Sequence, residues 1–298
     1  MSEYIKIYKK TEETYPEKLK ELTDAPKVLY VLGELPDPKK PTIAIVGARN
    51  CSMYGKNMAY EYARILAKNG VQIISGLARG VDAAAHEGAL AGGGKTYGIM
   101  GCGVDFCYPS SSKNLYERMQ GQGGILSEFS PGTPPLAYHF PMRNRIISGL
   151  AEAVVIVEAK EKSGSLITAD AALEQGRTVF AIPGRAGDLL SEGCNRLIYQ
   201  GAVPAWKPEI ILEEMNWRGL SQKNQENSNG QKKIVLARED DLVYSCLDLN
   251  PKAVSQLQEE TGLPVGSLLK SLYTLTTKDL AREAWKNYYI RTEKMGIS

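Results

Sequence analysis

The chain has 298 residues, of which 43% are hydrophobic and 23% are charged, and its formal net charge is +2. This is the composition of an ordinary soluble globular protein. No apolar run is long enough to cross a bilayer and the N-terminus does not resemble a signal peptide, so we expect a cytoplasmic protein without membrane association. Since the net charge is close to zero, any binding of a polyanion must come from local placement of basic residues.

The five cysteines and two histidines form neither a CxxC pair nor a metal-ligand pattern. We therefore expect reduced cysteines, no structural metal and no cofactor.

Residues 1–40 are expected to form a small N-terminal helical extension, because YPEKLKEL has a helical pattern. Residues 41–216 alternate helical stretches with short, continuously apolar segments. The predicted strands are 42–46, 71–75, 95–100, 124–129, 153–159 and 178–183. Apolar strands separated by helices predict an α/β domain, a Rossmann-like, doubly wound and mostly parallel sheet that is covered on both faces.

Residues 217–233 are polar and predict a flexible linker. Residues 234–298 have the helix–turn–helix rhythm of a winged-helix domain, with Pro264 at a helix start. The expected core residues of this domain are Leu263, Val265, Leu268, Leu269, Leu272 and Leu275. Basic and acidic residues balance from Lys233 onward, and Lys270 is the one cation of the expected recognition helix, which favours a protein-contact or auxiliary role over duplex binding.

The segment IAIVGARNCSMYG, residues 43–55, reads as a strand, a glycine turn and a helix start. It lacks the middle glycine of a dinucleotide loop and the GK[ST] of an ATP-binding loop, which argues against NAD and ATP. The loop still suits an anion, since Gly47 permits the turn, Arg49 supplies a guanidinium, Ser52 and Tyr54 supply hydroxyls and Gly55 opens a helix. A glycine turn with a solvated arginine explains this segment equally well.

The other predicted strands end in similar loops, and the carboxyl ends of parallel strands meet at one edge of a sheet. These loops carry Arg79, Lys113, Phe140, Arg143, Asn144, Arg145, Lys160, Lys162, Ser163, Gly164, Ser165 and Arg185. So many cations, glycines and hydroxyls at a common edge predict binding of an extended polyanion.

No histidine accompanies a nucleophile and no paired carboxylates are evident, so we expect no catalysis. Asp82, Asp105 and Glu158 are interpreted as capping, turn-forming or ion-pairing residues. His139 is expected to pack under its loop, whereas Phe140 could either pack or stack on bases.

The blocks VGARNCSMYG, SGLARGVDAAAHEGAL, GCGVDFCYP, FPMRNRIISGL and VEAKEKSGSLITADAALEQGR occur in the order found in the DprA/Smf family of DNA-processing proteins, which the chain resembles over nearly its whole length. The resemblance implies non-catalytic binding and protection of incoming single-stranded DNA, a homodimer formed through the Rossmann-like domain, and loading of the RecA recombinase during natural transformation. It places phosphate binding on Arg49, Ser52 and Gly55, followed by Lys113 and the segment from Arg143 to Arg145. The family commonly has Gly-Ser-Arg where this chain has Gly-Ala-Arg.

An enzyme is the alternative. The segment from FPMRNR to SGSLITADAA resembles the arrangement of nucleoside-monophosphate phosphoribohydrolases, but Asp170 and Ala171 stand where their catalytic glutamate would be expected. This departure disfavours the enzymatic interpretation.

Overall fold

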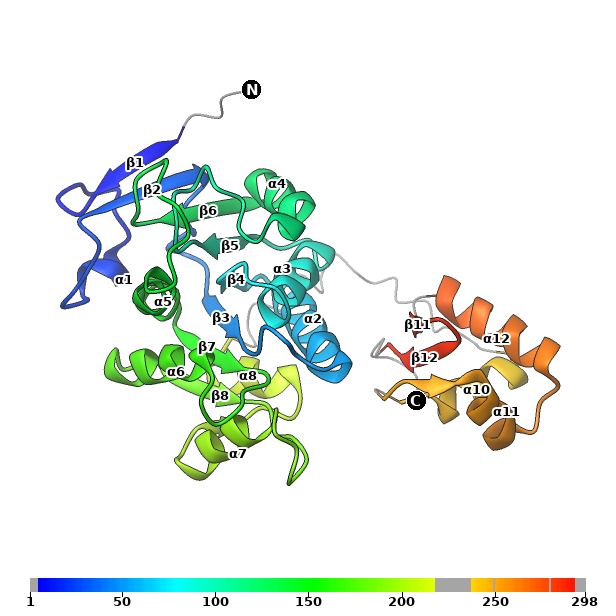
Figure 1. Ribbon diagram of the computed structural model, residues 1–298. Coiled ribbons are helices and arrows are strands. Elements are labelled where there is room, and N and C mark those ends of the chain that lie inside the picture. Colours follow the sequence, from blue (N-terminus) through cyan, green and yellow to red (C-terminus); the bar gives the residue numbers. More distant parts are fainter. Residues whose placement is uncertain (1–4, 218–236, 249, 279, 293–298) are drawn as a thin grey trace. The chain divides into compact units, whose positions relative to one another are not determined.

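The computed structural model describes residues 5–217, 237–248, 250–278 and 280–292 (Figure 1). The chain divides into two compact units, Met1–Gln225 and Glu226–Ser298. The predicted linker over 217–233 lies outside the described residues except for Trp217. Among the described helices, none combines the length and the apolar character that a membrane crossing requires.

The first unit alternates strands with helices along the chain (Figure 1). Its strands are β1 (Lys6–Lys9), β2 (Val28–Gly33), β3 (Thr42–Val46), β4 (Gln72–Ser75), β5 (Thr96–Ile99), β6 (Gly123–Ser127), β7 (Ala153–Ile156), β8 (Thr178–Ala181) and β9 (Val203–Pro204). Its helices are α1 (Glu17–Lys20), α2 (Met53–Lys68), α3 (Val81–Ala91), the 3-10 turn η1 (Ser110–Ser112), α4 (Lys113–Gly121), α5 (His139–Leu150), α6 (Gly164–Glu174), α7 (Glu192–Tyr199) and α8 (Pro208–Glu214).

These strands form a nine-stranded sheet in the order β1-β2-β6-β5-β4-β3-β7-β8-β9. Strands β3 to β9 run parallel to one another, with Ile43 of β3 opposite Ile73 of β4 and Ala153 of β7. The chain winds outward from β3 in one direction through β6 and in the other direction through β9. This confirms the predicted doubly wound α/β fold and makes β3 and β7 the switch point, where such folds bind ligands.

The N-terminal residues differ from the helical extension that we expected. Strands β1 and β2 join the main sheet, and β2 pairs antiparallel with β6, whereas α1 has a single turn. The reason is the apolar segment from Val28 to Gly33, in which Leu29 and Val31 are fully buried. The backbone of this segment forms hydrogen bonds with β6, so β2 is a strand of the main sheet and does not belong to a separate extension.

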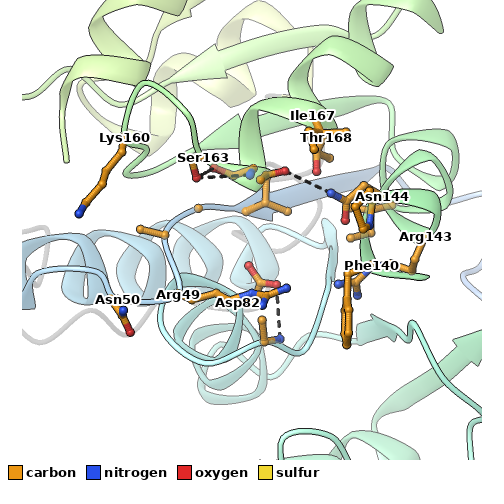
Figure 2. Close-up of a pocket in the computed structure, with 18 of the residues that line it drawn as sticks. Arg49, Asn50, Asp82, Phe140, Arg143, Asn144, Lys160, Ser163, Ile167 and Thr168 are labelled. Carbon is orange, nitrogen blue, oxygen red and sulfur yellow. Dashed lines mark hydrogen bonds between the residues drawn. The ribbon is translucent and has the colours of Figure 1, made fainter. Parts of the chain in front are cut away.

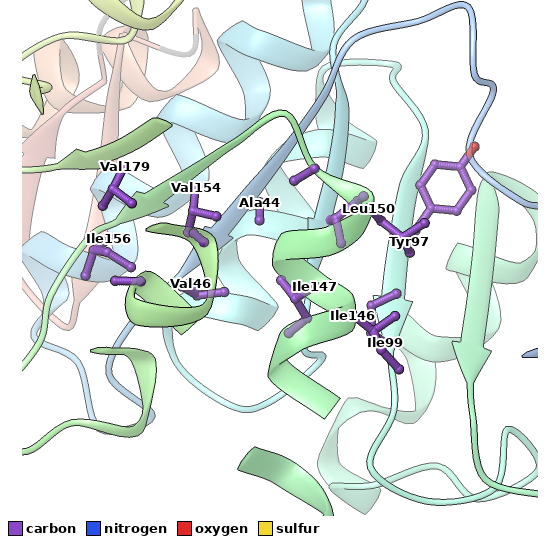
Figure 3. Packing of buried hydrophobic residues seen from close by; sticks show 14 of the residues in the cluster. Ala44, Val46, Tyr97, Ile99, Ile146, Ile147, Leu150, Val154, Ile156 and Val179 are labelled. Atoms are coloured by element: carbon purple, nitrogen blue, oxygen red, sulfur yellow. The ribbon is translucent and has the colours of Figure 1, made fainter. Parts of the chain in front are cut away.

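Buried residues alternate between the two faces of the central strands. Ala44 and Val46 of β3 share one hydrophobic cluster with Ile146, Ile147 and Leu150 of α5, as Figure 3 shows. Helices α1, α6 and α7 contribute to the same cluster. Helices α2 and α3 pack together on the opposite face and α4 packs beside α3, so the sheet is covered on both sides.

The second unit has its own core and a three-stranded sheet of order β10-β12-β11. Its elements are α10 (Arg238–Cys246), β10 (Lys252–Ala253), α11 (Val254–Thr261), α12 (Val265–Thr277), β11 (Ala281–Trp285) and β12 (Tyr288–Arg291). Leu268, Leu272 and Leu275 are buried as expected, but Val265 and Leu269 are each 44% exposed because they lie on the other face of α12. This order of elements is compatible with a winged helix, and that assignment stays a prediction.

Candidate functional site

A cleft of about 630 Å³ lies at the carboxyl ends of β3 and β7, and we call it the strand-end cleft (Figure 2). Most of the residues that line it come from the loop after β3, the start of α5, and the segment from the end of β7 into α6, and the others include one residue of α3 and one of the loop after β5. They include Gly47, Ala48, Arg49, Asn50, Asp82, Tyr108, Phe140, Arg143, Asn144, Lys160, Lys162, Ser163, Gly164, Ser165 and Thr168. The structure thus brings together ten of the residues that the sequence placed at the strand ends, which are Gly47, Arg49, Phe140, Arg143, Asn144, Lys160, Lys162, Ser163, Gly164 and Ser165.

Two glycines let the loop after β3 lie directly against α3. A Cβ on Gly47 would lie 2.8 Å from Cγ2 of Val81, and a Cβ on Gly80 would lie 2.5 Å from the carbonyl oxygens of Ala48 and Arg49. Gly80 also has a φ of +84°, which other residues rarely adopt. This close packing fixes the backbone that carries Arg49.

Arg49 is exposed, and its guanidinium carbon lies 5.2 Å from the centre of the Phe140 ring. In the described part of the chain, no carboxylate forms an ion pair with Arg49. The Phe140 ring is partly exposed and lies 5.5 Å from the Tyr108 ring. The charge of Arg49 also acts on the buried Asp82 carboxyl, but it is not neutralised by a close ion pair within the described residues. An exposed guanidinium of this kind, next to the Phe140 ring, can bind a phosphate beside a stacked base.

Arg143 has a different role from the phosphate contact that we expected. The side chain is buried, and its Nη1 donates hydrogen bonds to the carbonyl oxygens of Gly76, at 2.7 Å, and of Ile99. Burial lowers the pKa of Arg143 to about 10, and the nearby Arg49 contributes to the lowering, so Arg143 stays charged at neutral pH. It therefore joins the ends of β4 and β5 to α5, and its charge acts on the cleft from beneath the surface.

Asp82 lies beside Arg143 at the bottom of the cleft. A Cβ on Gly76 would be 2.6 Å from Oδ2 of Asp82 and equally close to both terminal nitrogens of Arg143, so glycine is needed there. Burial raises the pKa of the Asp82 carboxyl, and the charge of Arg143 opposes that rise. This position beside Arg143 agrees with the expectation that Asp82 interacts with an arginine.

The N-terminus of α6 forms the opposite wall of the cleft (Figure 2). Ser163 caps the helix by accepting a hydrogen bond from the Ser165 backbone N–H at 3.4 Å, and Asn144 donates from Nδ2 to the Gly164 carbonyl at 3.2 Å. Lys160 and Lys162, just before the cap, are both exposed in the lining. The positive end of the α6 helix dipole and the two lysines attract anions.

Ser52 and Gly55, which we expected to bind phosphate, have partners within the protein: Ser52 binds the carboxylate of Glu158, and Gly55 binds Ser52. The Ser52 backbone N–H donates to Oε2 of Glu158 at 2.8 Å, and its Oγ donates to Oε1 at 2.5 Å. The same Oγ accepts from the Gly55 N–H at 3.0 Å. Tyr54 is half-buried and lies outside the cleft lining. Glu158 is thus a capping residue, one of the roles predicted for it.

Arg145 lies outside the cleft lining, and its charge is already neutralised. The guanidinium contacts Glu128 at 2.8 Å and Asp24 at 2.6 Å. Arg79 and Lys113 are exposed, follow β4 and β5 respectively, and also lie outside the cleft lining. We leave Arg145 out of the proposed interface, whereas DNA contacts by Arg79 and Lys113 stay a prediction.

The remaining polar residues near the cleft have structural contacts. His139 is buried, stacks on Phe129 at 3.9 Å between ring centres, and its Nδ1 lies 3.1 Å from the Gly101 carbonyl, which confirms the predicted packing role. Asp105 accepts hydrogen bonds from the Gly132 N–H, as a turn-forming residue does. Asp170 is exposed on α6 and does not line the cleft. Among the described residues, no group of His, Cys, Asp and Glu could hold a metal ion.

The site residues predicted from the sequence do not include several that line the cleft. The sequence indicates Lys160 and Lys162 as cations at the strand ends, but it does not indicate Asn50, Tyr108 or Thr168. Tyr108 comes from the loop after β5, and no pattern in the sequence distinguishes its exposed ring from a packed one. The two lysines are easier to predict from the sequence than these residues, because they precede a helix start as Arg49 does.

The comparisons by sequence with known proteins agree on one group. A family model described as DNA recombination-mediator protein A matches residues 6–216. The DNA processing protein DprA of Streptococcus pneumoniae (strain ATCC BAA-255 / R6) is 45% identical over 206 residues, which are 69% of this chain and 73% of the relative. Protein Smf of Escherichia coli (strain K12) is 41% identical over 268 residues, which are 88% of this chain and 71% of the relative.

Two solved structures are similar to much of this chain. The crystal structure of DprA from Streptococcus pneumoniae has a TM-score of 0.68 at 43% identity, covering 70% of this chain and 74% of that one. A structure of DNA processing protein A from Helicobacter pylori, described for its single-stranded DNA binding mode, has a TM-score of 0.63 at 32% identity and covers 72% of this chain and 98% of that one.

Proposed function

The chain belongs to the DNA recombination-mediator protein A family, and on that premise we propose that it binds single-stranded DNA in the strand-end cleft. The resemblance to DprA/Smf proteins that the motifs indicated is confirmed, and the chain is a DNA-processing protein of the recombination-mediator class. The relative from Helicobacter pylori, which is described as binding single-stranded DNA, supports the choice of this ligand.

One observation carries the proposal, namely the placement of Arg49 opposite the N-terminus of α6. The guanidinium has no ion pair within the described residues, and the facing wall presents Lys160, Lys162 and the positive end of the α6 dipole. Phosphates of a single strand could bind along both walls, while the exposed part of Phe140 stacks on a base. These contacts to phosphates and ring faces carry little sequence information, so we expect sequence-tolerant binding.

The remaining parts of the proposal rest on the family resemblance. We propose that the protein has no catalytic activity, protects incoming single-stranded DNA and loads a RecA-type recombinase onto it during natural transformation, acting as a homodimer formed through its first unit. The exposed position of Asp170 outside the cleft lining weighs against the phosphoribohydrolase alternative. Incubation with AMP should release no adenine.

A gel-shift comparison tests the proposal directly. Labelled single-stranded oligonucleotides of mixed sequence and of poly-dT should both shift, and the matching duplex should need markedly more protein at the same salt concentration. Equal binding of duplex and single strand, or no binding of single strands at micromolar protein, would contradict it. Release of adenine from AMP in a parallel reaction would favour the enzymatic alternative.

A further inference from the structure

The N-terminus of α2 is where nucleotide-binding Rossmann folds hold a phosphate, because free amides and the helix dipole meet there. In this protein α2 has 16 residues, follows β3 directly and begins with the cap Ser52. The position would suit a phosphate, yet it is already filled from within the chain.

The group that fills it is the carboxylate of Glu158, which follows β7. Both of its oxygens are bound by Ser52, one through the backbone N–H at 2.8 Å and the other through Oγ at 2.5 Å. The residue is 4% exposed. A Cβ on Gly55 would lie 2.3 Å from Cδ of Glu158, so the carboxylate packs directly on the helix backbone.

The backbone of residue 158 holds the same loop. Its carbonyl accepts a hydrogen bond from the Ala48 N–H at 2.8 Å and lies 3.0 Å from where a Gly47 Cβ would be. Glu158 therefore binds the loop after β3 at both of its ends, before and after Arg49. An anion that displaced the carboxylate would have to enter a buried position and leave Glu158 without its hydrogen bonds.

We propose that Glu158 is a specificity-determining residue whose carboxylate takes the place of a nucleotide phosphate at the N-terminus of α2. It bars the phosphates of mononucleotides and dinucleotides from that position. This inference stands whether or not the cleft binds DNA. A second consequence, that DNA phosphates are left to the Arg49 and α6 walls, rests on the proposed function.

The Glu158→Ala variant tests this by chemical rescue in the full-length protein. Removing the CH₂–COO⁻ group should leave a hole of the size of acetate that is lined by the Ser52 N–H, its hydroxyl and the Gly55 backbone. Acetate at tens of millimolar should then raise the melting temperature of the variant by about 2–4 °C more than chloride does at equal ionic strength. Acetate and chloride should act alike on the wild type, in which the position is filled.

Glu158→Gln is the matched control, since it keeps the shape and one hydrogen-bond acceptor but removes the charge. It should be less destabilised than Glu158→Ala and should not respond to acetate. Inorganic phosphate should stabilise Glu158→Ala more than the wild type, and binding of phosphate by the strand-end cleft would appear equally in both proteins. Equal responses of Glu158→Ala and wild type to acetate and to phosphate would overturn the inference.

If Glu158→Ala does not fold, Glu158→Gln carries the test through Cys51, which lies next to Ser52. Burial and then the negative charge of Glu158 raise the pKa of the Cys51 thiol. Loss of that charge should lower this pKa and speed alkylation of Cys51 at pH 8 severalfold, read by peptide mass spectrometry with Cys107 as the internal reference. An unchanged Cys51 rate would contradict a charged carboxylate at the helix start, and neither result depends on DNA binding.

Discussion

The guanidinium carbon of Arg49 lies 5.2 Å from the centre of the Phe140 ring, although the two residues belong to different elements of the fold. Arg49 follows β3 and Phe140 lies in the first turn of α5, so packing of α5 on the sheet decides their separation. A cation and a partly exposed ring at this distance offer a phosphate contact and a base platform side by side.

Replacing Phe140 with alanine should weaken single-strand binding by about 1–3 kcal/mol, because a stacked base loses its platform. Phe140→Tyr keeps the ring and should bind within about twofold of wild type. Fluorescence-anisotropy titrations with poly-dT and mixed-sequence oligonucleotides measure both variants. If Phe140→Ala binds as tightly as Phe140→Tyr, the ring serves packing alone.

Replacing both Lys160 and Lys162 with alanine should weaken single-strand binding and lower the log–log salt slope by about 1.4, since each phosphate that a lysine neutralises adds about 0.7 to the slope. Lys68→Ala is a suitable control, since Lys68 is exposed at the other end of α2, about 24 Å along a 16-residue helix. The control should keep the slope of the wild type. Identical slopes for all three proteins would remove the α6 wall from the interface.

Arg145→Ala should reduce stability and leave DNA binding unchanged. The guanidinium bridges Glu128 and Asp24, and Glu128 would keep a largely buried charge without its partner. We expect a loss of about 1.5–3 kcal/mol in the free energy of unfolding, as for hydrogen bonds to charged groups. Urea unfolding and anisotropy measured on the same sample separate the two effects, and a tenfold loss of affinity in the folded variant would return Arg145 to the interface.

The free energy of unfolding should fall in mild acid because of His86. This residue is fully buried, its Nδ1 lies 2.7 Å from Oγ1 of Thr96, and burial lowers its pKa from 6.5 to about 3. The unfolded chain binds the proton below pH 6.5 and the folded chain does not, so stability is complete above pH 6.5 and is lost between pH 6.5 and 3 at up to about 1.4 kcal/mol per pH unit.

Comparison with a His86→Gln variant isolates this contribution, because other groups such as Asp82 titrate in both proteins. Urea unfolding at about pH 7.5 and about pH 5 should show a larger loss in the wild type than in the variant, by about 1–2 kcal/mol. Equal losses in both proteins would mean that His86 already carries its proton in the folded state.

Local patterns in the sequence were sufficient to predict the parallel sheet and the position of Arg49. The continuous apolar run of β3 followed by Gly47 fixes where the strand ends, and strand ends of one sheet meet at one edge. The same reasoning located Ser163 at the start of α6.

Contacts between distant residues could not be predicted in this way. Glu158 is 106 residues from Ser52, and the carbonyls that bind Arg143 lie 67 and 44 residues away. A pattern of residue types therefore placed Arg49, Arg143 and Arg145 in one class. Packing separates them, since Arg49 is exposed, Arg143 is buried among carbonyl groups and Arg145 is paired with carboxylates.

The central claim is that Arg49 holds a phosphate of single-stranded DNA, and a salt titration of Arg49→Ala tests it most directly. Anisotropy of wild type and variant should be measured at several salt concentrations, with Arg49→Lys and with Arg118→Ala, whose guanidinium is paired with Glu87. We predict that Arg49→Ala binds about 10- to 150-fold more weakly, as for removal of a charge-assisted hydrogen bond, and that its salt slope falls by about 0.7. Arg49→Lys should be intermediate, because it keeps the charge but lacks the planar fork, and Arg118→Ala should match the wild type. Parallel lines with equal intercepts for wild type and Arg49→Ala would contradict the account.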